Sequence, residues 1–89
     1  MKAIIIRVDG NEECMDLRFR EIAPAIGADA MDHVSLRDGR IMLVDDLGHS
    51  KGLAVNRKAT LLYHSVCKPG TVHAIVGDVA IIRDTESRS

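Results

Sequence analysis

The sequence predicts a small α+β protein with a mostly antiparallel sheet and two short helices, in the order β-β-α-β-β-α-β. Short β-rich apolar runs alternate with two segments in which apolar residues recur at helical spacing. Turn residues, rather than long crossover segments, separate the predicted strands, and this favours antiparallel pairing. The chain has 89 residues, of which 46% are hydrophobic, which suits one globular domain. We assign this domain to residues 1–84 and treat residues 85–89 as a polar tail.

The chain opens with a predicted β-hairpin. Residues 2–8 form a short β-branched run that is typical of a buried strand, and the triplet Asp9, Gly10 and Asn11 supplies turn chemistry after it. Residues 13–17 then return as a weak strand at the edge of the sheet, where charged side chains discourage pairing with other chains.

A first helix is indicated by helical spacing of apolar residues and by residues suited to its ends. The apolar residues at this spacing are Phe19, Ile22, Ala23 and Ile26. Asp16 is a candidate N-cap, and Gly27 suits the position just after the helix. Pro24 lies inside the segment and removes a backbone donor, so we expect a kink or a late start.

A second hairpin gives the clearest local signal. Residues 31–36 and 41–45 flank Asp38 and Gly39, the preferred pair for a two-residue type I′ turn. The pairs that follow from this turn are Leu36 with Ile41, Val34 with Leu43, and Arg37 with Arg40. Two opposed arginines cost a few tenths of a kcal/mol, about as much as other like-charge pairs. Either solvent at the hairpin tip screens the repulsion between these two arginines, or the arginines contact an anion.

The second half of the chain predicts a loop, a helix and a final β-rich region. Residues 46–54 form the loop, and Asn56 caps a helix whose apolar face repeats at helical spacing. The residues of that face are Ala59, Leu62, Tyr63 and Val66. Residues 72–76 and 79–82 are β-rich and are separated by Gly77 and Asp78. They form either one strand with a bulge or a strand entered through a turn.

Composition excludes several classes of function. No apolar run approaches the ~20 residues of a membrane span, and the start does not resemble a secretory signal. We therefore expect a cytoplasmic protein whose two cysteines stay reduced. The net charge is −1, the isoelectric point is about 6.4 and only 2% of the residues are aromatic. Nucleic-acid binding is thus not expected, because base stacking needs aromatic side chains and phosphates need basic ones.

Catalytic and metal-binding patterns are also missing from the sequence. The four histidines have no zinc-ligand spacing, and neither cysteine has the surroundings of a catalytic nucleophile. Asp45, Asp46 and His49 form the one cluster that suits a divalent ion or an active site, although such trios arise often by chance. We predict a protein that is not an enzyme and carries no metal or cofactor.

The polar residues that stand out surround the start of the second helix. A small basic loop, residues 48–52, leads into it, and a helix N-terminus with nearby cations suits an anion. The predicted ligand-binding residues are Lys51, Asn56, Arg57 and Thr60, with Arg37 and Arg40 from the second hairpin. Alternatively, Asn56 only caps the helix and Arg57 only solvates its first turn.

Four short motifs support a family resemblance. They are the strand and acidic pair at residues 43–48, the Lys-Gly-Leu step at 51–53, the helix start at 56–60, and the Ile-Val-Gly-Asp-Val segment at 75–79. The chain resembles a family of small uncharacterised proteins encoded by bacteriophages and actinobacterial mobile elements. That family commonly has Asn within the acidic pair, whereas this chain has Asp45 and Asp46. The family also commonly has a pair of glycines near the end of the first helix. This chain has Gly27 and Ala28 there.

The resemblance implies an accessory protein that acts in the host cytoplasm and carries no established reaction. Small accessory proteins of this kind often counter host defences, either by sequestering a nucleotide signal or by binding a defence protein. We therefore hypothesise a binding module for a small anionic, nucleotide-like ligand. The alternative is a protein-interaction module that inhibits a host protein. Because so small a chain with so few aromatic residues builds a thin core, we expect a homodimer or higher oligomer.

Overall fold

The computed structural model describes residues 1–36, 39–66 and 73–83 and confirms the predicted α+β fold. Its elements follow the predicted order β-β-α-β-β-α-β. They are β1 (Lys2–Ile6), β2 (Glu12–Asp16), α1 (Phe19–Ile26), β3 (Met31–Ser35), β4 (Arg40–Asp45), α2 (Arg57–Val66) and β5 (Val79–Arg83). The predicted polar tail lies outside the described residues.

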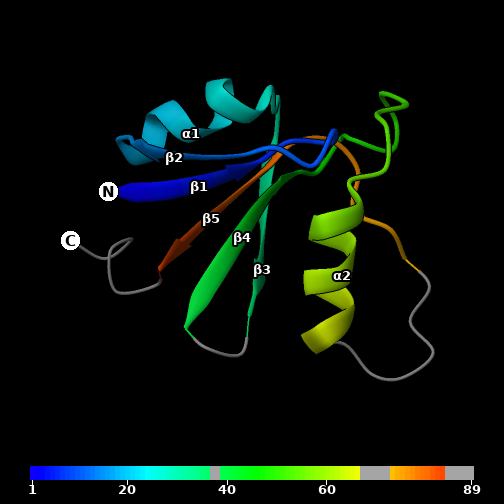
Figure 1. Ribbon diagram of the computed structural model, residues 1–89. Coiled ribbons are helices and arrows are strands. Elements are labelled where there is room, and N and C mark those ends of the chain that lie inside the picture. Colours follow the sequence, from blue (N-terminus) through cyan, green and yellow to red (C-terminus); the bar gives the residue numbers. More distant parts are fainter. Residues whose placement is uncertain (37–38, 67–72, 84–89) are drawn as a thin grey trace.

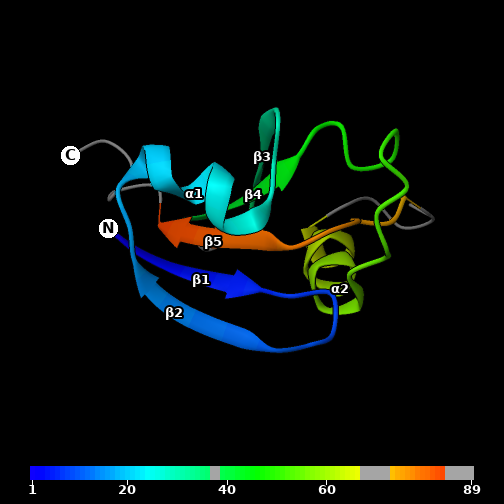
Figure 2. The ribbon, with the colours of Figure 1, turned by 90° about the horizontal axis from the view of Figure 1, so that it is seen from above.

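The five strands form one sheet in the order β2-β1-β5-β4-β3, and all neighbouring strands are antiparallel. The last strand, β5, therefore sits in the middle and joins the two hairpins. Figure 1 shows β3 and β4 running steeply across the direction of β1 and β2, which is the twist that strands of L-residues adopt. Figure 2 shows α1 lying over the sheet and α2 beyond its other face.

Helix α1 covers one face of the sheet and ends as the sequence predicts. Ile22 and Ile26 are buried against alternate residues of β1, β4 and β5, and Gly27 takes a positive φ of 69° just after the helix. The predicted N-cap is wrong, because Asp16 belongs to β2 and binds the N-terminal ammonium at 3.1 Å. The helix begins after Arg18 instead, whose backbone N–H donates to Glu21 Oε1 at 2.8 Å.

Helix α2 lies on the opposite face and packs more loosely. Its buried residue is Ala59, while Leu62, Tyr63 and Val66 are half-buried against Val79, Ile81 and neighbouring residues of the sheet. The predicted cap is confirmed, since Asn56 Oδ1 accepts the backbone N–H of Ala59 at 3.1 Å. Leu61 is 70% exposed. The helix thus touches the sheet along one narrow line and leaves part of that sheet face uncovered.

The predicted register of the second hairpin is wrong by one residue. Ser35 pairs with Ile41 and Val34 with Met42, and the Leu36 N–H donates to the Arg40 carbonyl at 2.8 Å. Residues 37–39 therefore join the strands, so the connection has three residues rather than two. Gly39 has a φ of 82°, which suits the left-handed position of such three-residue connections. Arg37 lies outside the described residues.

Of the two alternatives for residues 72–76 and 79–82, the single strand with a bulge is excluded over the part that is described. Residues 73–76 carry one isolated bridge, between Val76 and Val55, and β5 starts only at Val79. Gly77 causes the break because its φ of 78° turns the chain out of an extended conformation. Of the two alternatives that the sequence left open, the chain adopts a strand entered through a turn.

Candidate functional site

The predicted ligand-binding residue Lys51 is engaged inside the protein. Its Nζ lies 2.5 Å from Asp45 Oδ2, 2.9 Å from Asp29 Oδ2 and 3.1 Å from the Gly27 carbonyl oxygen. The Asp45 side chain is only 1% exposed. Hydrogen bonding to Lys51 lowers the pKa of Asp45 from its ordinary value, and the same hydrogen bond raises the pKa of Lys51. Lys51 therefore ties the loop to β4 and to the end of α1.

Asn56 and Thr60 also have internal partners. The buried Asn56 amide donates to the carbonyl oxygens of Ile6 at 2.9 Å and Gly77 at 3.0 Å. The Thr60 hydroxyl donates to the Asn56 carbonyl at 2.8 Å and accepts the backbone N–H of Ile75 at 3.0 Å. These two side chains anchor the start of α2 to β1 and to the segment before β5.

The remaining predicted residues do not join them. Arg57 is exposed at the start of α2, and Arg37 lies outside the described residues. Arg40 begins β4, whereas Lys51 contacts Asp45 at the other end of that strand. Five residues of strand separate these ends by about 16 Å. The structure thus divides the predicted anion site between two places.

The predicted acidic cluster is arranged around other partners. Asp45 pairs with Lys51, and its Oδ1 accepts the Leu47 N–H at 3.0 Å. His49 Nε2 lies 3.2 Å from the Ala74 carbonyl oxygen. Within the described ranges, no three side chains of His, Cys, Asp or Glu are grouped as a metal site would require.

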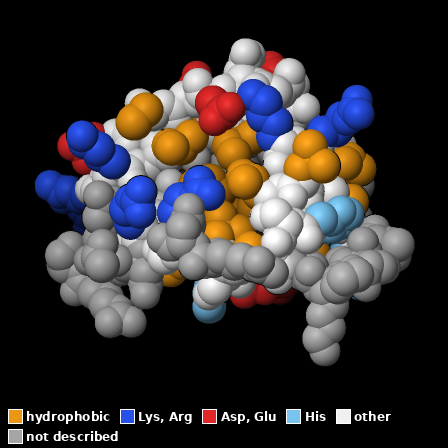
Figure 3. Space-filling model, turned by 60° about the horizontal axis from the view of Figure 1, so that its bottom comes forward, with side chains coloured by type: hydrophobic (Ala, Val, Ile, Leu, Met, Phe, Trp, Pro, Cys, Tyr) orange, Lys and Arg blue, Asp and Glu red, His pale blue; other side chains and the backbone are white. Residues whose placement is uncertain are grey.

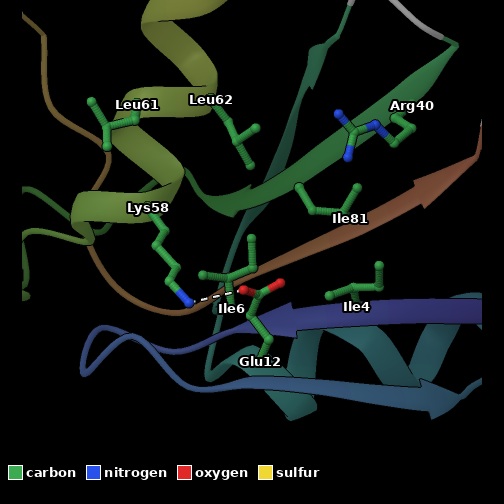
Figure 4. A pocket seen from close by; sticks show the side chains of 8 residues that line it. All are labelled: Ile4, Ile6, Glu12, Arg40, Lys58, Leu61, Leu62 and Ile81. Carbon is green, nitrogen blue, oxygen red and sulfur yellow. Dashed lines mark hydrogen bonds and ion pairs between the residues drawn. The ribbon is translucent and has the colours of Figure 1, made fainter.

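A different site lies where α2 leaves the sheet uncovered. A hollow of about 390 Å³, which we call the α2 groove, opens between this helix and strands β1, β4 and β5. Its lining residues are Ile4, Ile6, Glu12, Arg40, Lys58, Leu61, Leu62 and Ile81. Figure 4 shows Leu62 projecting from α2 toward the sheet, with Ile4 and Ile81 on the floor and Arg40 on the far side. Most of this lining is aliphatic.

Three cations lie beside the groove in one row across the sheet. Arg40 of β4 and Arg83 of β5 are opposite each other in the strand register. Extending the β1–β5 register by two residues places Lys2 opposite Arg83 on the other side. We call Lys2, Arg83 and Arg40 the cation row. With Ile4, Ile81 and Cys14 they line a second hollow of about 270 Å³. The two hollows adjoin at Ile4, Arg40 and Ile81, which line both, and we call them together the depression.

The cation row places like charges on adjacent strands of one sheet face. Neighbouring strands lie about 4.8 Å apart, and like charges directly opposed on one sheet face destabilise it. At the other end of the groove lies an ion pair, in which Lys58 Nζ is 2.8 Å from Glu12 Oε2. Figure 3 shows Lys and Arg side chains gathered beside an apolar hollow on this face. The cation row therefore lies at one end of the depression, the Lys58–Glu12 pair at the other, and aliphatic side chains between them.

Sequence reasoning found Arg40 but missed Lys2 and Arg83. Lys2 is the first residue of β1 and Arg83 is the last residue of β5. The other residues of both strands are apolar. The alternation of each strand fixes which face its cation takes. Only the strand order brings them together, however, and no local pattern predicts that β5 lies between β1 and β4.

Comparison of the chain with protein-family models, with curated proteins and with solved structures finds no match. Among the described residues, no helix is long and apolar enough to cross a membrane.

Proposed function

We propose that this protein is a binding module, rather than an enzyme, and that it holds a small anionic ligand in the α2 groove. The observation that carries the proposal is the cation row, which aligns three positive side chains along one edge of an apolar hollow. Clusters of cationic side chains bind oppositely charged ligands through charge-assisted hydrogen bonds, which are stronger than neutral ones.

Size and charge both support this proposal. The groove volume of about 390 Å³ falls within the ~300–1,000 Å³ typical of small-molecule sites. Of the described side chains that line the two hollows, four are cationic and one, Glu12, is acidic. Glu12 forms an ion pair with Lys58. The nucleotide-like identity of the ligand, the phage or mobile-element setting and the role against host defence stay predictions from the resemblance.

The test is calorimetric titration with inorganic phosphate, AMP, cyclic AMP and octanoate against the wild type, Arg83→Gln and Arg57→Gln. We expect at least one of these anions to bind, and we expect Arg83→Gln to weaken it about tenfold or more, as for other hydrogen bonds between charged groups. Arg57→Gln is the matched control, because Arg57 is also exposed but does not line the groove.

Two outcomes would overturn the proposal. One is that none of the four anions binds. The other is that Arg57→Gln abolishes binding and Arg83→Gln does not, which would return the site to the start of α2. Binding should also weaken as salt is raised from 50 to 500 mM, because the cation row faces solvent.

A protein-interaction module is the second candidate, favoured by the exposure of large apolar residues. Leu61 is 70% exposed beside the groove, and Val55 is 51% exposed near the start of α2. If a host protein docks here, Leu61→Ser should weaken its binding, while Leu47→Ser at an exposed apolar residue away from the groove should not. A partner whose affinity is equal for both variants would exclude docking at the groove.

A further inference from the structure

The distribution of charge in the depression narrows the ligand class. We propose that the α2 groove takes an aliphatic anion, with an unbranched hydrocarbon chain that ends in a carboxylate or phosphate. This inference rests on the proposed function and specifies its ligand. The head group would meet the cation row, and the chain would lie along the groove between α2 and the sheet.

The apolar part of the groove suits a hydrocarbon chain better than a nucleobase. Its floor and wall are the aliphatic side chains of Ile4, Ile6, Ile81, Leu61 and Leu62. A base gains affinity by stacking on aromatic rings or guanidinium planes and by pairing its polar edges. Neither Phe19 nor Tyr63 lines the groove. The polar groups at the end away from the cation row, Lys58 and Glu12, already bind each other.

The cationic part suits a terminal carboxylate or phosphate. Arg40 and Arg83 are direct cross-strand partners, and arginine pairs in a bidentate manner with the oxygens of such groups. Lys2 adds a third positive charge from the next strand. Because all three lie at one end of the depression, the ligand's charge must also lie at one end, as it does in an amphiphile.

The length of the groove sets the length of the chain. Positions along β1 give this length. The cation row lies at Lys2, and the Lys58–Glu12 ion pair lies at Ile6, which is the cross-strand partner of Glu12. Four residues of strand span about 13 Å. A fully extended chain with C–C bonds of about 1.5 Å advances about 1.3 Å per carbon, so about ten carbons fill this distance. The Lys58–Glu12 ion pair then stops the chain.

The experiment is a chain-length series of hexanoate, octanoate, decanoate and dodecanoate, each kept below its micelle concentration and titrated by calorimetry. Burying one methylene group gains about a fourfold increase in affinity, so two carbons should gain about 15-fold. We expect this rise up to decanoate and little further gain with dodecanoate. Decyl phosphate should bind as decanoate does, whereas decanol and decylamine should bind at least tenfold more weakly.

Two variants separate the parts of the site. Arg83→Gln should weaken decanoate about tenfold but leave decanol unchanged. Leu61→Ser should flatten the chain-length dependence, and it should not disturb folding because Leu61 is 70% exposed. Leu47→Ser, at another exposed leucine, is the control and should leave the whole series unchanged. In a Cys67→Ser background, bound decanoate should slow alkylation of Cys14, which lines the cationic end.

The outcomes distinguish the inference from the proposed function. If phosphate or AMP binds through Arg83 while affinity does not rise from hexanoate to decanoate, the anion site stands and the aliphatic ligand is wrong. If neither short anions nor the aliphatic series binds, both proposals fail. If chain length raises affinity equally in wild type and Leu61→Ser, with Cys14 unprotected, the chain binds elsewhere and the inference is overturned.

Discussion

Asn56 is the residue at which three parts of the fold meet. Its amide nitrogen bonds the ends of β1 and of the Gly77 turn, and its amide oxygen caps α2. The sequence predicted the cap, because Asn before an amphipathic segment is a local signal. It could not predict the two carbonyl partners, since Ile6 lies 50 residues away in the chain. The side chain predicted to bind a ligand is fully used inside the protein.

We predict that Asn56→Ala lowers the free energy of unfolding by about 2–4 kcal/mol, because it removes a helix cap and two buried hydrogen bonds. Urea unfolding followed by circular dichroism measures the change. Arg57→Ala, at the exposed next residue, should stay within about 0.5 kcal/mol of wild type. Equal effects of the two substitutions would contradict the anchoring role of Asn56.

The Asp45–Lys51 pair predicts a dependence of stability on pH. The pKa of Asp45 is below its ordinary value of 3.8 because of the hydrogen bond from Lys51. A carboxyl group with a lowered folded-state pKa stabilises the fold above its unfolded-state pKa, and this contribution disappears as the pH falls through the folded-state value. Lys51→Met should therefore lower the urea midpoint clearly at pH 7, where it leaves Asp45 buried without its cation.

The same substitution should matter progressively less as the pH is lowered below 3.8, because protonation of Asp45 removes the charge that Lys51 pairs with. Urea midpoints at pH 7 and pH 2.5 check this. Lys58→Met is the matched control, because its partner Glu12 is half exposed and exposed ion pairs contribute little. A loss for Lys51→Met that is the same at both pH values would exclude the ion pair as its cause.

At the scale of elements, local patterns predicted which segments form helices and strands, and they failed where the backbone turns. The two helices predicted from helical spacing, α1 and α2, are confirmed. The two predicted hairpins are confirmed as well. The predicted register of the second hairpin was wrong by one residue. Asp38-Gly39 is the preferred pair of a two-residue turn, but the positive φ of Gly39 belongs here to a connection of three residues. Residues 72–76 have the composition of a strand, but β-propensity depends on the neighbours in the sheet. The described part of this segment forms one isolated bridge before the Gly77 turn and no continuous strand pairing.

The Gly77 turn is therefore expected to be sensitive to substitution. An added Cβ would stand 2.8 Å from Leu53 Cδ1, and the backbone has a φ of 78°. Gly77→Ala should lower the free energy of unfolding by about 1–3 kcal/mol, the usual cost of a strained backbone position. Gly10→Ala is the control, since its φ of 94° carries backbone strain but nothing lies within 4 Å of the added Cβ.

Comparing these variants separates the two causes. Gly77→Ala should cost more than Gly10→Ala, and combining it with Leu53→Ala should cost less than the sum of the single substitutions, because the clash is gone. Thermal unfolding of the wild type, the three single variants and the double variant measures this. Strict additivity would mean that Leu53 does not contact the turn.

At the scale of the whole molecule, the groove arises from strand order rather than from any one segment. The cation row takes Lys2, Arg83 and Arg40 from strands that are distant in sequence. No periodicity contains that information, because the position of β5 between the two hairpins is decided by tertiary packing of both apolar faces. The sequence thus predicted an anion site around the helix start, where local signals are strongest, whereas the cation row on which our proposal depends lies elsewhere on the sheet.

The predicted homodimer can be argued from the two open edges of the sheet, β2 and β3. Antiparallel pairing of two β2 strands about Cys14 would oppose Glu12 of one copy to Asp16 of the other, which is unfavourable. Pairing of two β3 strands about His33 opposes Asp32 to Val34 and brings no acidic pair together. A second copy should therefore add to β3, and the mass from light scattering should be twice 9.7 kDa.

Substitutions at the centres of the two edge strands test this arrangement. His33→Lys places two lysines opposite each other in a β3 pairing and should shift the mass toward the monomer, since opposed like charges destabilise adjacent strands. Cys14→Lys makes the same change at the centre of β2 and should leave the dimer intact. Both residues are exposed, so neither variant should lose its fold. A wild-type monomer, or a dimer broken only by Cys14→Lys, would rule out association through β3.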